Sequence, residues 1–63
     1  MKFTLEFDMD NSAFDGSNER RKEVSRILTE MGRLVASTGA EPGEPFVLRD
    51  VNGNKIGRAE ILA

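Results

Sequence analysis

Acidic and polar side chains gather in residues 8–12, and their spacing begins like a calcium-binding loop. The segment reads DMDNS, with carboxylate or hydroxyl oxygens at alternate positions, and oxygen atoms are the ligands that Ca²⁺ prefers. Glu19 falls at the twelfth loop position, where a calcium loop carries a bidentate acid. The sixth position is Ala13 instead of glycine, however, and the seventh is the apolar Phe14. We therefore interpret the segment as a turn with capping acids and expect no metal site.

The other residues that could do chemistry form no catalytic pattern. The chain has no Cys and no His, which removes thiolates, imidazole bases and ordinary zinc sites. Residues 50–54 also look like the start of a calcium loop, but Lys55 takes the sixth position, so we interpret them as a turn. Glu41 and Glu44 lie in a Pro/Gly-rich stretch without an apolar pocket, and no glycine has the setting of a phosphate-binding loop. We expect a protein that is not an enzyme and that binds no cofactor.

One amphipathic helix, predicted over residues 18–37, organises the chain. Its apolar residues recur at intervals of three and four, so they form one stripe that must be buried. Ser17 is the expected N-cap, with Asp15 as the competing cap, and Gly39 suits the left-handed residue that closes many helices. The stripe consists of Val24, Ile27, Leu28, Met31, Leu34 and Val35.

Three strands are predicted to cover this stripe. Residues 2–8 alternate strictly between apolar and polar types, which is typical of a half-buried strand. Residues 46–51 and 55–62 flank Asn52-Gly53, a dipeptide that favours a hairpin turn. Phe14, in the loop before the helix, is expected to plug one end of the core.

The hairpin admits two loop lengths. A two-residue loop places Asp50 opposite Lys55 and sets two large residues against small ones, Leu48 against Gly57 and Phe46 against Ala59. A three-residue loop with a bulge would shift this register by one residue. We favour the two-residue loop, because it places Phe46, Leu48, Ala59 and Ile61 together under the helix.

These elements predict a single α+β domain over residues 1–63 with the order β-α-β-β. If the third strand is central, the sheet has the order 1-3-2, every neighbouring pair is antiparallel, and the helix packs on one face. The predicted core contains Phe3, Leu5, Phe7, Leu28, Met31 and Phe46.

Two exposed surfaces are candidates for binding a partner. On the helix, Lys22, Arg26 and Arg33 form a basic stripe opposite the core, although ion pairs of Arg26 with Glu23 and Glu30, and of Glu30 with Arg33, would neutralise it. On the uncovered sheet face, an aliphatic cluster would lie beside open strand edges, which favours interaction. We slightly favour the sheet face, whose candidate residues are Val47, Arg49, Val51, Ile56 and Arg58.

Charge and hydropathy restrict the class of partner. A net charge of −2 argues against a constitutive nucleic-acid binder, whose domains usually run basic. The longest apolar runs are three residues, and residues 1–4 lack the apolar core of a secretory signal. We expect a cytoplasmic protein with no membrane partner.

Several stretches together resemble small proteins encoded by phages and prophages. They are the Lys-Phe start with alternating apolar residues, residues 10–14 (DNSAF), the apolar helix stripe around Arg-Ile-Leu, and residues 48–57 (LRDVNGNKIG). The resemblance covers nearly the whole chain, and its most specific part is the Arg-Asp-x-Asn-Gly-Asn stretch. It implies a setting inside a bacterial host, and it supplies no catalytic or binding residues.

Two functional hypotheses follow. The first is a small protein-binding module without enzymatic activity, such as a phage-encoded inhibitor of a host defence complex. The second is a nucleic-acid-associated accessory protein that uses the basic helix stripe. The acidity of the chain favours the first, with a host protein as partner. The open sheet also suggests a homodimer.

Overall fold

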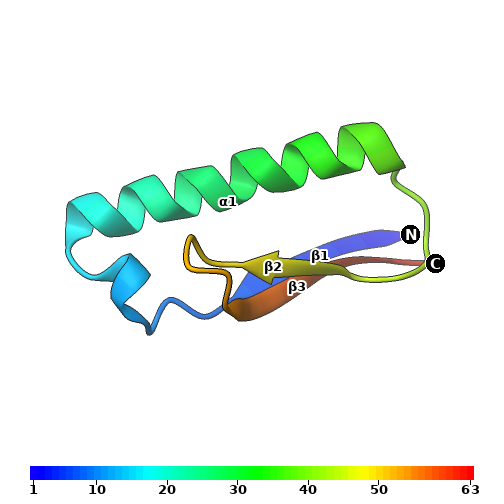
Figure 1. Ribbon diagram of the computed structural model, residues 1–63. Coiled ribbons are helices and arrows are strands. Elements are labelled where there is room, and N and C mark those ends of the chain that lie inside the picture. Colours follow the sequence, from blue (N-terminus) through cyan, green and yellow to red (C-terminus); the bar gives the residue numbers. More distant parts are fainter.

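The computed structural model describes all residues, 1–63, and consists of one long helix lying across one face of a small sheet (Figure 1). The sheet has the order β1-β3-β2, and both neighbouring pairs are antiparallel. The predicted α+β fold and strand order are therefore confirmed. The elements are β1 (Lys2–Phe7), the 3₁₀ helix η1 (Ser12–Phe14), α1 (Ser17–Thr38), β2 (Phe46–Arg49) and β3 (Lys55–Leu62).

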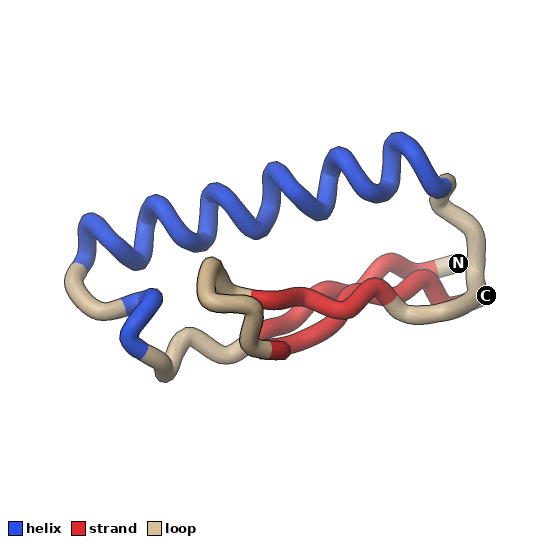
Figure 2. Tube along the Cα trace, in the orientation of Figure 1, coloured by secondary structure: helices blue, strands red, loops and turns tan.

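Helix α1 determines the length of the molecule. Its 22 residues correspond to about 33 Å at 1.5 Å per residue, close to the longest dimension of 37 Å, and Figure 2 shows it running the full length of the sheet. It begins after Gly16, which has a φ of 82° and gives no side-chain cap. The predicted N-cap, Ser17, is thus wrong by one residue, because it is already helical. Gly39 closes the helix as predicted, with a φ of 97° and its N–H bonded to the Val35 carbonyl.

The core lies between α1, η1 and the inner face of the sheet. Its buried apolar residues are Phe14, Ile27, Met31, Leu48, Ala59 and Ile61. Phe14 is 1% exposed and stacks on Phe7 with ring centroids 6.1 Å apart, so it closes one end of the core as predicted. The single turn of η1 that delivers Phe14 was not predicted. It is capped by Asn11, whose side chain accepts from the Ala13 amide.

Two residues predicted to be in the core are half-exposed instead. Leu28 is 49% exposed and Phe3 is 48% exposed. The buried line of α1 runs through Glu23, Ile27 and Met31, one residue every four. Leu28 lies about 100° around the helix from Ile27 and therefore falls on the flank. The helix is therefore rotated away from the expected stripe, and Glu23 falls on its buried line, where its carboxylate accepts from the Val51 amide of the hairpin loop.

The hairpin between β2 and β3 has a three-residue loop, so the preferred two-residue loop was wrong. The Asp50 amide donates to the Asn54 carbonyl at 2.9 Å, and the Gly53 amide donates to the Asp50 carbonyl at 3.0 Å. Gly53 has a φ of 86°, as a type I turn followed by a left-handed glycine requires. Asp50 is therefore paired with Asn54, and Lys55 is opposite Arg49 instead of Asp50.

A bulge in β3 then restores the predicted register. Between Arg49↔Lys55 and Leu48↔Gly57, Ile56 is an extra residue without a partner on β2. Leu48 consequently faces Gly57 and Phe46 faces Ala59, as predicted.

Candidate functional site

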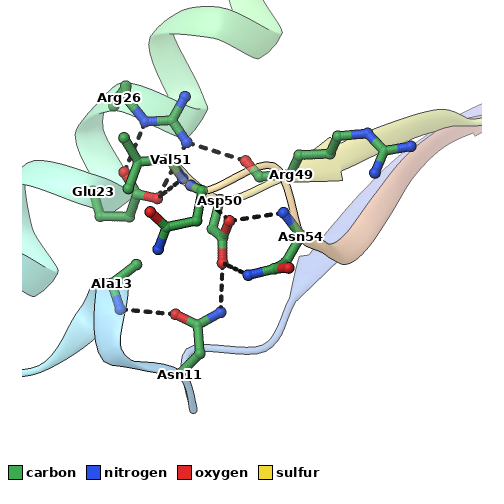
Figure 3. A network of polar contacts seen from close by, with 9 residues as sticks. Asn11, Ala13, Glu23, Arg26, Arg49, Asp50, Val51 and Asn54 are labelled. Atoms are coloured by element: carbon green, nitrogen blue, oxygen red, sulfur yellow. Dashed lines mark hydrogen bonds and ion pairs between the residues drawn. The ribbon is translucent and has the colours of Figure 1, made fainter.

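A buried carboxylate, Asp50, organises the hairpin loop (Figure 3). Its Oδ1 accepts from the amides of Asn52 and Asn54, each at 2.9 Å. Its Oδ2 accepts from the side chains of Asn54 at 3.1 Å and Asn11 at 2.8 Å. Desolvation raises the pKa of Asp50, but the hydrogen bonds from Asn54, Asn52 and Asn11 outweigh it and hold the pKa below its ordinary value. Asp50 thus joins the hairpin loop to the segment before η1.

A second buried carboxylate, Glu23, joins the same loop to α1. Its Oε1 accepts a hydrogen bond from Arg26 Nε at 2.7 Å. Its Oε2 accepts from Arg26 Nη2 at 3.1 Å and from the Val51 amide at 2.7 Å. Arg26 Nη2 donates further to the Arg49 carbonyl at 3.0 Å. The hydrogen bond from Arg26 holds the pKa of Glu23 below its ordinary value, against the effect of burial and with help from the Val51 amide.

The two carboxylates and the side chains bonded to them hold the hairpin loop, the segment before η1 and α1 together. We call this group the clamp; it consists of Asn11, Glu23, Arg26, Asp50 and Asn54. No buried side-chain nitrogen or oxygen lacks a hydrogen-bond partner, so the buried atoms of the clamp are satisfied within the chain. No group of three or more acidic side chains is placed to hold a metal ion. The clamp matters for function because it decides which of the candidate residues remain available.

Arg26, the central residue of the basic helix stripe, is engaged in the clamp. Arg26 is held by Glu23 and by the Arg49 carbonyl, whereas Lys22 and Arg33 are exposed and make no ion pair. Of the three predicted ion pairs along the helix, only that between Glu23 and Arg26 forms. Lys22 and Arg33 are eleven residues apart, about 16 Å along the helix, so the stripe is reduced to two separated cations.

The aliphatic cluster predicted on the open sheet face does not form. Val47 is exposed on β2, but Val51 lies in the loop, with its amide bonded to Glu23 on the helix side. Ile56 is half-buried and packs against the core, because the bulge displaces it. The expectation that Val47, Val51 and Ile56 are neighbours on this face was therefore wrong.

The two predicted arginines of the open sheet face, Arg49 and Arg58, are both exposed. Arg58 pairs with Glu60 at 3.3 Å, and Arg49 donates to the Gly53 carbonyl at 3.1 Å. A shallow groove of about 420 Å³ crosses this region, lined mainly by charged residues of both signs, including Glu6, Lys55 and Arg58. It is therefore a mixed-charge surface, to which Phe7 and Ile56 add the apolar part of the lining.

Another surface, which was not predicted, carries exposed apolar side chains. We call it the α1 hollow: an open depression of about 630 Å³ whose apolar floor is made by Met9, Val24 and Leu28. Met9 is 47% exposed and Leu28 is 49% exposed. The rim is polar and cationic and consists of Ser17, Arg20, Arg21, Ser25 and Thr29.

The α1 hollow results from the rotation of the helix. With Ile27 and Met31 pointing into the core, Val24 and Leu28 fall on the flank, and Met9 lies beside them just beyond the end of β1. Arg21 Nη2 donates a hydrogen bond to Asn18 Oδ1 at 3.1 Å. Neither Arg20 nor Arg21 forms an ion pair with an acidic side chain. The only feature of the sequence that pointed to this surface was the pair Arg20 and Arg21, which lies one helical turn before the apolar stripe.

Comparison of the chain with family models, curated proteins and solved structures gives no significant match. No helix in the structure is both long enough and apolar enough to cross a membrane.

Proposed function

We propose that the chain is a protein-binding module without enzymatic activity and that it contacts its partner through the α1 hollow. The observation that carries the proposal is the exposure of Leu28 and Met9, two large apolar side chains that lie together on a small domain. Adjacent apolar side chains with a polar rim are typical of a protein-interaction site. Met9 adds an unbranched, adaptable side chain, which suits contact with an irregular apolar surface.

The chemistry of the hollow defines the partner surface. Its floor accepts an apolar side chain, and its two unpaired arginines, Arg20 and Arg21, attract carboxylates placed around that side chain. Arginine is enriched at interface centres because its planar guanidinium binds carboxylates bidentately. The expected partner segment is thus acidic with one central apolar residue.

The resemblance to phage and prophage proteins supports a bacterial host protein as the partner, such as a component of a defence complex that this chain inhibits in the cytoplasm. The nucleic-acid alternative has less support. Arg26 is tied to Glu23 and to the backbone, and only Lys22 and Arg33 of the stripe are free to meet phosphates.

Capture from a bacterial lysate, followed by mass spectrometry, tests this proposal if matched variants are run together. Reversing Arg20 and Arg21 to Glu should remove the specific partner from the captured set, because attraction becomes repulsion at the rim. The matched control is reversal of Lys22 and Arg33, which carry the same charge on the same helix outside the hollow. Equal loss with both pairs, or loss only with Lys22 and Arg33, would overturn the assignment to the hollow.

A further inference from the structure

The outer edge of β1 presents unpaired backbone groups. The Asp8 amide donates to the Ile56 carbonyl at 3.0 Å, so the backbone of Asp8 points toward β3. Backbone direction alternates along a strand, and the N–H and C=O groups of Phe3, Leu5 and Phe7 therefore point away from β3. Because β1 is the first strand of the order β1-β3-β2, no strand covers this edge. A row of unpaired groups of this kind is a template for another strand.

The opposite edge of the sheet is protected. Strand β2 has only four residues, and it is preceded by Pro45, which has no N–H to donate. The Arg49 carbonyl on this edge is already bonded to Arg26. The two edges thus differ, since β2 is short and partly capped whereas β1 is longer and open.

We propose that two copies of this chain pair through their β1 edges as an antiparallel homodimer, with Thr4 on the two-fold axis. Phe3 of each copy then lies opposite Leu5 of the other, and both residues point their free backbone groups across the edge. Lys2 of each copy lies opposite Glu6 of the other, which forms two cross-strand ion pairs. The sheet becomes six-stranded, and the contact is symmetric, as a two-fold interface requires.

Charge complementarity within β1 selects this register. Free backbone groups meet only if residues 3, 5 and 7 pair among themselves, which restricts the axis to one of the residues from Phe3 to Phe7. An axis at Glu6 sets the two Glu6 side chains against each other, and an axis at Phe7 sets Glu6 against Asp8. An axis at Phe3 sets Lys2 against Thr4, and an axis at Leu5 sets Glu6 against Thr4. Only the axis at Thr4 gives each charged residue of the strand an opposite charge. It also places Phe3, which is 48% exposed in the single chain, beside a large apolar side chain of the second copy.

The proposal is tested by sedimentation equilibrium over the micromolar to millimolar range with charge-swap variants. The parent should dimerise. Lys2→Glu alone and Glu6→Lys alone should each weaken self-association by about tenfold or more, because two attractive cross-strand pairs become two repulsive ones. The double variant Lys2→Glu/Glu6→Lys should dimerise like the parent, and an equimolar mixture of the two single variants should form a heterodimer.

The outcomes separate this dimer from other associations. A parent that stays monomeric at millimolar concentration overturns the proposal. If neither Lys2→Glu nor Glu6→Lys weakens the dimer, the β1 edge is not the interface. If only Lys2→Glu weakens it, Lys2 and Glu6 do not face each other and the register is wrong. Leu28→Ser, in the α1 hollow, should leave dimerisation unchanged, and a dimer lost with this variant would assign the contact to the hollow instead. Circular dichroism confirms that each variant is folded.

Discussion

Removing the Glu23 carboxylate tests how strongly the hairpin loop holds the helix. The Glu23→Ala variant loses the two hydrogen bonds from Arg26 and the one from the Val51 amide, and it leaves both partners without the carboxylate. Hydrogen bonds to a charged group contribute about 1.5 to 3 kcal/mol. Because Arg26 is partly exposed, its ion pair adds little, and we expect the free energy of unfolding to fall at neutral pH by about 1.5 to 3 kcal/mol, the contribution of the buried hydrogen bond from the Val51 amide.

The assay is urea unfolding followed by circular dichroism. For a domain of this size the dependence of the unfolding free energy on urea is about 1 kcal/mol per molar, so the midpoint should fall by about 1.5 to 3 M. Glu30→Ala is the matched control, because Glu30 is an exposed acid on the same helix without an ion pair, and its midpoint should change little. Glu23→Gln keeps an acceptor for the Val51 amide and should lie between the two.

Equal midpoints for Glu23→Ala and Glu30→Ala would refute this reasoning. They would mean that the carboxylate in the clamp contributes no more than a solvated surface acid.

Four further predictions concern stability and binding. Gly57→Ala should destabilise the sheet by about 1 to 3 kcal/mol in thermal unfolding, because its Cβ would meet the β1 backbone, including the Phe7 Cα at 2.5 Å. Gly32→Ala, on the helix with nothing within 4 Å of its Cβ, should instead stabilise by about 0.5 to 1 kcal/mol. The pKa values of Glu23 and Asp50 in the folded state lie below their ordinary values of 4.5 and 3.8, so the unfolded state binds more protons in acid. The free energy of unfolding should therefore fall as the pH drops below these ordinary values. A free energy of unfolding that does not change with pH in this range would contradict the prediction. Fluorescence anisotropy with duplex DNA should show binding no tighter than about 10⁻⁴ to 10⁻⁶ M at physiological salt.

The fold was predictable because local pattern and tertiary contact agree along most of the chain. The alternation in β1 and the helical spacing around Ile27 and Met31 are strong signals, and both elements form as predicted. The pairing of large with small residues across the hairpin also held, with Leu48 opposite Gly57. These features depend on residues that are neighbours within one element or across one turn.

The errors arise where distant residues decide the local structure. Asn52-Gly53 is compatible with either hairpin loop, and the three-residue form accompanies a loop capped by Asp50, which Asn11 also holds from far along the chain. Glu23 has the pattern of a solvated helix acid, yet it is buried because it binds the Val51 amide. No local pattern contains either contact.

The α1 hollow could not be predicted for the same reason. Its floor depends on the rotation of the helix, which moves Leu28 from the expected core to the flank. The predicted binding residues of the sheet face were chosen on regular strand alternation, and the bulge at Ile56 and the turn at Val51 break that alternation. The backbone irregularities therefore decide which surface is apolar.

The affinity of the captured partner for Leu28→Ser, measured by surface plasmon resonance beside the parent chain, tests the proposed function most directly. The side chain is 49% exposed, so the variant should stay folded with a urea midpoint near that of the parent. We predict that its affinity falls by about tenfold or more, equivalent to about 1.4 kcal/mol, because the floor of the hollow loses one of its two exposed large apolar side chains. A folded Leu28→Ser variant that binds the partner as tightly as the parent would contradict the proposal that the hollow is the binding site.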